Sequence, residues 1–138
     1  MANTFHVSMV SADRQLYSGE AERLVATAER GELGILAGHA PFLSILKAGQ
    51  VRLTLPDSKE EVIYISGGFI EVQQGQTIIL ADDAERAEQL DEERVREARR
   101  RAEEKMRDKT STKLELARAQ AELAQTMAQL AAIRRAKN

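Results

Sequence analysis

Cysteine is absent from the sequence, histidine occurs twice, and aromatic residues make up only 4% of the 138 residues. Without cysteine the chain has no disulfide, no thiolate nucleophile and no cysteine-ligated zinc site. Two histidines, His6 and His39, are too few for a histidine-rich metal site. We therefore expect no metal site and a core that is mainly aliphatic.

Long apolar runs are also missing. No run approaches the roughly 20 residues that a membrane-spanning helix needs. The first ten residues, MANTFHVSMV, lack the basic segment and the apolar block of a signal peptide. These features predict a mature cytoplasmic protein.

Three glycines gather in the stretch GELGILAGHAP at residues 31–41, which raises the question of a phosphate-binding loop. A P-loop needs Lys and then Ser or Thr after its last glycine, whereas His39 and Ala40 follow Gly38 here. A dinucleotide-binding turn needs a helix after its glycines, and no helical pattern follows Pro41. We therefore expect the glycines to form tight corners between strands, with His39 favoured as a structural residue over a ligand or an acid–base group.

Charge is unevenly distributed along the chain. Residues 1–84 contain 6 Lys and Arg against 11 Asp and Glu, whereas residues 85–138 contain 14 against 11. The first part is therefore acidic and the second basic. Such an asymmetry indicates two units that face different partners.

The first part alternates apolar and polar residues with period two, which is typical of half-buried strands. The pattern appears in six segments: TFHVSMV, RLVAT, VRLTL, EVIYIS, GFIEV and TIILA. Turn residues separate them at Ser18-Gly19, Lys47 to Gly49, Pro56 to Ser58, Gly67-Gly68 and Gln74-Gly75. Short strands at this spacing, without helical patterns between them, predict an antiparallel sandwich or barrel.

The pattern changes near residue 85, beyond which good helix formers dominate. Asp91 is placed to cap a first helix over 91–108. After a break at DKTSTK, Thr112 and Glu115 have the spacing of a capping box, which predicts a second helix over 113–135. The two helices should form an antiparallel hairpin.

The second helix carries an apolar stripe of residues three or four apart: Leu116, Ala119, Leu123, Met127, Leu130 and Ile133, with Ala117, Ala121, Ala124, Ala128 and Ala131 beside them. The first helix offers only Val95, Ala98, Ala102 and Met106 in return. Because fixing each backbone residue costs about 1–2 kcal/mol, such a hairpin is marginal alone. We expect it to dock on another surface, and weakly.

No motif assembles a nucleophile, a base and an oxyanion site. The serines show no GxSxG motif. The paired acids Glu60-Glu61 and Asp82-Asp83 fall beside a turn and at a strand end, where solvated carboxylates are ordinary. We therefore expect no catalytic residue.

The first helix is basic from Arg94 onward. Two interpretations stay open: a solvated helix with Glu–Arg pairs such as Glu97 to Arg101, or electrostatic docking on an acidic partner. Nucleic acid is disfavoured, because the chain is acidic overall and the helix has no interleaved aromatic residues.

Taken in order, these motifs resemble the ε-subunit family of bacterial F-type ATP synthases. The resemblance covers nearly the whole chain and rests on GELGI at 31–35, GHAP at 38–41, SGG at 66–68 and ILAD at 79–82, followed by a charged hairpin. It implies an α+β fold: a flattened antiparallel β-sandwich of about ten strands over residues 1–85, then a two-helix hairpin over 86–138.

The resemblance also implies partners. In the family, the sandwich packs on the γ subunit and on the membrane ring of c subunits, in a complex that also holds α and β subunits. The expected ring contacts here are Glu32, Gly34, Gly38 and His39. The chain would be peripheral on the cytoplasmic face of the bacterial inner membrane, attached only through the proton-translocating complex whose ring rotation it couples to the catalytic head.

The family's hairpin has a compact form on the sandwich and an extended form that reaches the catalytic head and blocks ATP hydrolysis. Its basic residues meet an acidic segment of the catalytic β subunit. The residues expected to do so here are Arg99, Arg100, Lys105, Arg107, Lys109 and Lys113.

Some family members bind ATP at the compact hairpin, through a motif that resembles LDEERV at residues 90–95. The matching residues are Glu85, Asp91, Arg94 and Arg101, whereas Val95 replaces a small alanine. The resemblance implies weak regulatory ATP binding and no required cofactor. Asp91 as a plain helix cap is an equal alternative.

One alternative function belongs to a different class. Free-standing chaperone-like and transcription-cleft factors also combine a β domain with a protruding helical hairpin. Several of them place the helical coil first, which is the reverse of the order here.

Overall fold

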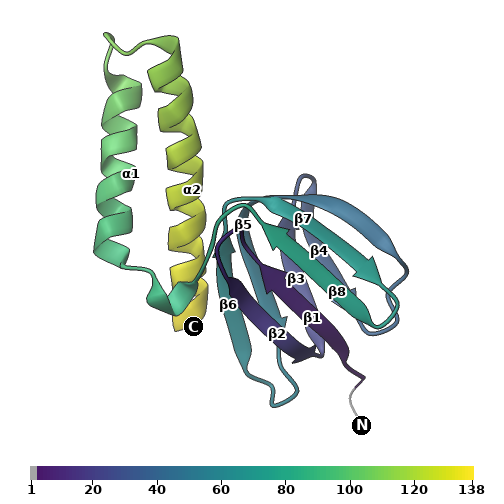
Figure 1. The fold of residues 1–138 in the computed structure, drawn as a ribbon. Coiled ribbons are helices and arrows are strands. Elements are labelled where there is room, and N and C mark those ends of the chain that lie inside the picture. Colours follow the sequence, from purple (N-terminus) through teal and green to yellow (C-terminus); the bar gives the residue numbers. More distant parts are fainter. Residues whose placement is uncertain (1–2) are drawn as a thin grey trace.

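A computed structural model describes residues 3–138 as a β-sandwich followed by a helical hairpin that stands beside it (Figure 1). The elements in chain order are β1 (Phe5–Val10), β2 (Gln15–Ala21), β3 (Arg23–Ala28), β4 (Gly31–Leu36), β5 (Phe42–Thr54), β6 (Glu60–Ile65), β7 (Gly68–Gln73), β8 (Gln76–Ala81), β9 (Ala84–Arg86), a 3-10 turn η1 (Ala87–Gln89), α1 (Glu92–Arg107) and α2 (Lys113–Lys137). This confirms the predicted order of a sandwich and then a hairpin.

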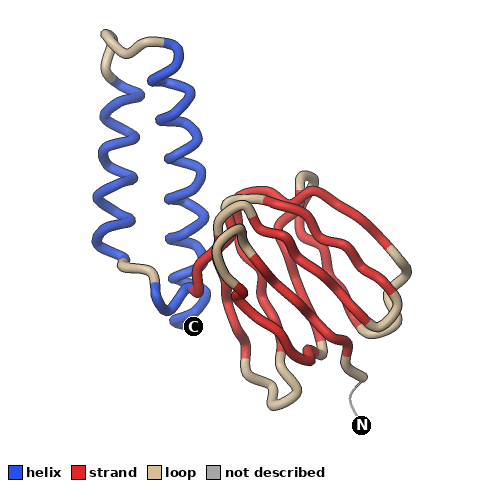
Figure 2. The backbone as a smooth tube through the Cα atoms, viewed as in Figure 1, coloured by secondary structure: helices blue, strands red, loops and turns tan. Residues whose placement is uncertain are grey.

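The strands form one hydrogen-bonded network that folds into two layers (Figure 2). In the first layer the order is β2-β1-β8-β7 and the first half of β5. The second layer contains β4, β3, the second half of β5, β6 and β9. All strand pairs among residues 3–138 are antiparallel except β1 with β8, which is parallel.

The long strand β5 belongs to both layers. Phe42–Leu46 pairs with β7, and Gly49–Thr54 pairs with β6. The turn predicted at Lys47 to Gly49 is therefore wrong, because the chain bends there without leaving the sheet. A Cβ at Gly49 would lie 2.4 Å from the Cβ of Thr27, so the Thr27 side chain occupies the space that any other residue would need. The double use of β5 accounts for nine strands where about ten were expected.

The six predicted segments all form strands, whereas four strand regions were not predicted: β2, β4, the first half of β5 and β9. The turn predicted at Ser18-Gly19 is wrong, because both residues lie within β2. The turns at Pro56 to Ser58 and Gln74-Gly75 are confirmed, and Ser58 has a φ of 71°. Gly67 lies in a bend and Gly68 opens β7.

The sandwich core is aliphatic, as predicted. Its large, fully buried side chains come from both layers: Val7, Met9, Leu24, Ile35, Val51, Leu53, Ile63, Ile65, Ile70 and Ile79. The buried residues of this cluster run from Phe5 to Ala84, and none belongs to α1 or α2. The sandwich therefore has a core of its own.

Both helices begin at the predicted caps. The Asp91 carboxylate accepts hydrogen bonds from the backbone amides of Glu93 and Arg94, and Thr112 and Glu115 form the predicted capping box. No helix within residues 3–138 combines the length and the apolar character that a membrane span requires.

The predicted apolar stripe of α2 is wrong in part. Ala119, Leu130 and Ile133 are buried, but Met127 is 51% exposed, and most of the accompanying alanines face solvent. Ala132, outside the stripe, is fully buried. The reason is that α2 packs on two surfaces at once, on α1 and on the sandwich, so its buried face does not follow a single stripe.

Candidate functional site

The glycine-rich stretch is a strand flanked by two turns. Gly31 opens β4 with a φ of 127°, and Gly38 follows β4 with a φ of 83°, so both use backbone conformations that favour glycine. Gly34 lies inside β4, where an added Cβ would meet no atom within 4 Å. The predicted corner role is confirmed for Gly31 and Gly38 and wrong for Gly34.

Glu32 and His39 lie towards opposite ends of β4. The strand separates them by about 13 Å, since it rises about 3.3 Å per residue. Glu32 is exposed, and its carboxylate accepts a hydrogen bond of 2.8 Å from Arg52. Nδ1 of His39 lies 2.7 Å from the carbonyl oxygen of Ala40, and its ring meets Phe42 edge-on. Both contacts fit the structural role that the sequence favours for His39, and its expected contact with the c-ring stays a prediction.

An apolar row crosses the outer face of the first layer. Ile45 of β5 pairs with Phe69 of β7, which pairs with Leu80 of β8, and each of these side chains is about half exposed. Leu43, two residues before Ile45, is 66% exposed. We call Leu43, Ile45, Phe69 and Leu80 the outer apolar row. Large apolar side chains exposed side by side in this way are typical of protein–protein contact surfaces.

The hairpin docks on β6 and the adjoining half of β5 (Figure 1). Val62 and Tyr64 of β6 pack there with Ala87 and Ala132. Burial raises the pKa of Tyr64 to about 12. Leu90 connects this cluster to a second one, in which α1 meets α2: Val95, Leu130 and Ile133. Val62 and Tyr64 are the large side chains that the described part of the sandwich contributes to this buried cluster, so the apolar part of the docking contact is small.

Two ion pairs hold the C-terminal end of α2. The guanidinium of Arg135 makes two hydrogen bonds to the Glu60 carboxylate, at 2.9 and 3.1 Å, and Lys137 Nζ lies 2.6 Å from Glu92. These contacts lower the pKa of Glu60 and of Glu92 below the ordinary value of 4.5. The lowered pKa of Glu60 stabilises the docked state above about pH 4.5, and this stabilisation is lost as the pH falls through the lowered value. The Glu92–Lys137 pair joins α1 to α2 within the hairpin.

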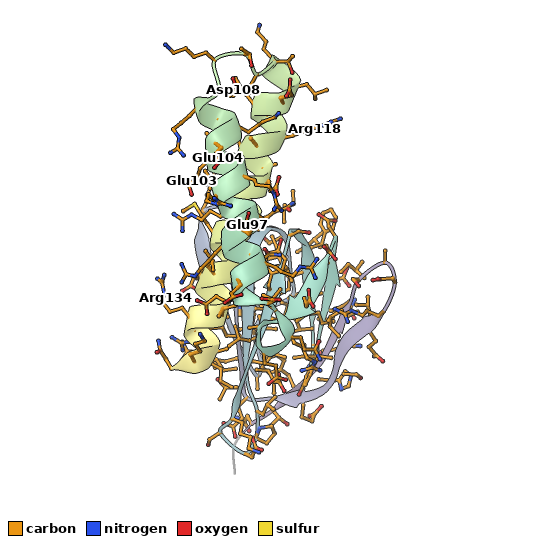
Figure 3. All side chains as sticks on the ribbon, turned by 90° about the vertical axis from the view of Figure 1, so that its left-hand side faces the viewer. Glu97, Glu103, Glu104, Asp108, Arg118 and Arg134 are labelled. Atoms are coloured by element: carbon orange, nitrogen blue, oxygen red, sulfur yellow. The ribbon has the colours of Figure 1, made fainter. Side chains whose placement is uncertain are left out.

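The six basic residues expected to meet an acidic partner fall into two groups. Arg99, Arg100 and Lys105 pair with Glu103, Glu97 and Glu115, respectively. Arg107, Lys109 and Lys113 are exposed, and no ion pair is found for them within residues 3–138. Figure 3 shows acids along α1 and Asp108 at the end of the hairpin farthest from the sandwich. The Glu–Arg pairs of a solvated helix are thus present along α1, whereas docking of the tip on an acidic partner stays a prediction.

The four residues expected to bind ATP are not gathered in one pocket of the described residues. Arg101 lines a cleft of about 620 Å³ between α1 and α2, whose lining does not include Glu85, Asp91 or Arg94. Asp91 is engaged as a helix cap. Val95 packs on Leu130 and Ile133. Arg94 and Arg101 still share a face of α1, because they are two turns apart, about 10 Å along the axis.

Sequence reasoning missed the outer apolar row and the residues that hold the docked hairpin. Phe69 gave a signal, because it occupies an outward position of the alternating segment GFIEV. Arg52, Glu60 and Arg135 gave none, because their contacts join residues up to 75 positions apart.

The structure is that of a two-part protein: a β-sandwich with an exposed apolar row on its outer face, joined to a helical hairpin docked on its second layer. The chain belongs to the ATP synthase delta/epsilon family. Residues 4–87 match the family's beta-sandwich domain, and residues 88–134 match its long alpha-helix domain.

Curated relatives agree over nearly the full length. The ATP synthase epsilon chain of Dichelobacter nodosus is 54% identical, with 98% of both chains covered. That of Nitrosospira multiformis is 52% identical, with 95% of this chain and 94% of the relative covered. The chain is thus a subunit of the ATP synthase and not itself catalytic, and the chaperone-like alternative finds no support among these relatives.

Solved structures share the fold. A chain of the Euglena gracilis mitochondrial ATP synthase, from a structure of OSCP, F1 and c-ring, superposes with a TM-score of 0.85 at 23% identity, covering 94% of this chain and 81% of that one. A chain from the central stalk and c-ring of the Tetrahymena thermophila enzyme gives a TM-score of 0.59 at 15% identity, covering 93% and 95%.

Proposed function

We propose that this chain is the central-stalk subunit that joins the γ subunit to the c-ring of a bacterial proton-translocating ATP synthase and restrains ATP hydrolysis through its hairpin. The outer apolar row carries this proposal, because a sandwich with its own core has no need of an exposed row of large side chains. The chain would then be peripheral at the cytoplasmic face of the inner membrane, held through its partners, which include the α and β subunits.

The outer apolar row is the proposed docking surface for the γ subunit. Replacing Phe69 by Arg places a charge in the middle of this row and is expected to weaken binding to γ by roughly 30-fold or more, the loss typical of an aromatic residue at the centre of an interface. Titration calorimetry with purified γ measures the effect.

The control is Leu114→Arg, which makes the same kind of exposed substitution on α2, away from the row. It should leave the affinity for γ within about twofold, since scattered exposed apolar residues are ordinary. Equal affinities for the Phe69→Arg variant and the parent would show that γ binds elsewhere. Failure to co-purify with α, β and γ would overturn the whole assignment.

Glu32 is the proposed contact with the polar loops of the c-ring. Its side chain is 54% exposed beside the β3–β4 turn, as a contact residue must be. Gly34, Gly38 and His39 complete the proposed contact along β4 and the turn after it. The supporting feature is that this edge strand is exposed at four of its six residues.

Reversing the charge with Glu32→Arg is expected to reduce the number of protons pumped per ATP hydrolysed. The ratio tests coupling and does not depend on how many complexes are active. Because the substitution removes the half-exposed ion pair with Arg52, the stability of the isolated chain should fall by about 1 kcal/mol at most, which leaves the domain folded. A normal pumping ratio in inverted membrane vesicles would count against the ring contact.

The hairpin is the proposed brake on hydrolysis. Its docked contact is small, and its tip carries the exposed cations Arg107, Lys109 and Lys113, which suit an acidic segment of the β subunit. Arg99, Arg100 and Lys105 would join them after exchanging their present carboxylate partners. Weak regulatory ATP binding near Glu85, Asp91, Arg94 and Arg101 remains part of this proposal, and Arg94 and Arg101 on one helix face support it.

A further inference from the structure

Four side chains of alternating charge form a line from β4 to the end of α2. The Glu32 carboxylate accepts a 2.8 Å hydrogen bond from Arg52 Nη1. Arg52 Nε lies 4.0 Å from the nearer oxygen of Glu60, and the same oxygen accepts a 2.9 Å hydrogen bond from Arg135. Glu32 and Arg135, the ends of the line, belong to the proposed ring contact and to the docked hairpin.

The strand pairing explains why these residues meet. Arg52 lies opposite Val25 of β3 on one side and opposite Val62 of β6 on the other. Its side chain reaches across β3 to Glu32 on the edge strand β4. Glu60, at the start of β6, lies beside the last turn of α2. Arg52 is the least exposed member of the line, with 15% of its side chain accessible, so both carboxylates compete for a cation that has little water around it.

We propose that Arg52 couples the ring-facing strand to the hairpin, so that occupation of Glu32 by a partner weakens the hold of Glu60 on Arg135. This inference rests on the proposed ring contact of Glu32. Release of the hairpin would then depend on whether the sandwich is bound to the c-ring. The four ion-paired side chains would connect the two events.

The direction follows from the charges. With Glu32 in place, its carboxylate draws Arg52 away from Glu60, which leaves both Glu60 oxygens to Arg135. When Glu32 is neutralised or taken by another cation, Arg52 turns fully to Glu60 and shares the oxygen that Arg135 now binds. The two guanidinium groups then repel each other across one carboxylate, and the docked hairpin loses stability. Glu32 also contributes to the raised pKa of Arg135, behind the larger effect of the Glu60 hydrogen bond.

The isolated full-length chain is suited to the test because it contains no cysteine. Introducing Gln74→Cys on the sandwich and Ala117→Cys on α2, both at exposed positions, allows a fluorophore pair to report docked and undocked molecules. Glu32→Gln is expected to raise the undocked-to-docked ratio by about two- to fivefold, as for the loss of one partly exposed ion pair. Glu29→Gln, which removes the same charge from the adjoining turn, should leave the ratio unchanged.

To isolate the role of Arg52, the same fluorescence measurement is made on Glu32→Gln and Glu29→Gln in a chain that also carries Arg52→Gln. In this background Glu32→Gln should have no further effect on the undocked-to-docked ratio. An unchanged ratio in Glu32→Gln, or an effect that persists in full without Arg52, would overturn the inference. The number of protons pumped per ATP in the Glu32→Arg variant tests the proposed ring contact independently of the coupling through Arg52. Impaired pumping with an unresponsive hairpin would refute the coupling alone, and normal pumping with a responsive hairpin would refute the ring contact alone.

Discussion

Deleting residues 88–138 is expected to raise ATP hydrolysis by the assembled enzyme several-fold while ATP synthesis continues. If the hairpin holds about nine-tenths of the complexes in the braked state, its removal frees them and the rate rises about tenfold. The measurement is steady-state hydrolysis by membranes reconstituted with the truncated or the full-length chain, at equal enzyme content.

The truncated chain should fold, because the buried cluster of the sandwich contains no residue of α1 or α2. It exposes Val62 and Tyr64, however, which α2 covers in the full chain. Val62→Thr in the truncated chain is the control for non-specific association through this surface, and it should give the same hydrolysis rate. Hydrolysis that matches the full-length enzyme would leave the brake without support.

Gly68→Ala is expected to destabilise the sandwich by roughly 3 kcal/mol or more. Gly68 opens β7 with a φ of 144°, and an added Cβ would lie 2.1 Å from the carbonyl oxygen of Leu80 and 2.9 Å from the Cα of Ala81. Both obstacles are backbone atoms of a paired strand, so neither can move aside cheaply. Urea unfolding of the isolated chain, followed by circular dichroism, measures the loss.

Gly34→Ala is the matched control, because it makes the same chemical change where no atom lies within 4 Å and φ is not positive. The unfolded chain loses entropy in both variants, so Gly34→Ala should be neutral or more stable by about 0.4–1 kcal/mol. Equal unfolding midpoints for the two variants would contradict the steric argument at Gly68.

The segments predicted well are those in which local pattern and tertiary packing agree. TFHVSMV and GFIEV alternate cleanly because one face of each strand meets the core. Asp91 and Thr112 mark helix starts through contacts within three residues, which a local pattern contains in full.

The errors arise where distant partners decide the outcome. Lys47 to Gly49 and Ser18-Gly19 have the composition of turns, but neighbouring strands keep both segments in the sheet. The buried face of α2 differs from its apolar stripe because Ala132 meets Val62 and Tyr64, residues about 70 positions earlier. The residues of the proposed ring contact resemble one glycine loop in sequence, whereas in space the strand β4 separates Glu32 from His39.

The parallel pairing of β1 with β8 has a consequence for biosynthesis. Because β1 pairs with β8 as well as with β2, about 70 further residues must be synthesised after β1 before its second neighbour exists. At about 5–20 residues per second, that delay lasts several seconds. The sandwich is thus completed only shortly before the hairpin is synthesised. The hairpin then meets a docking surface that has already folded.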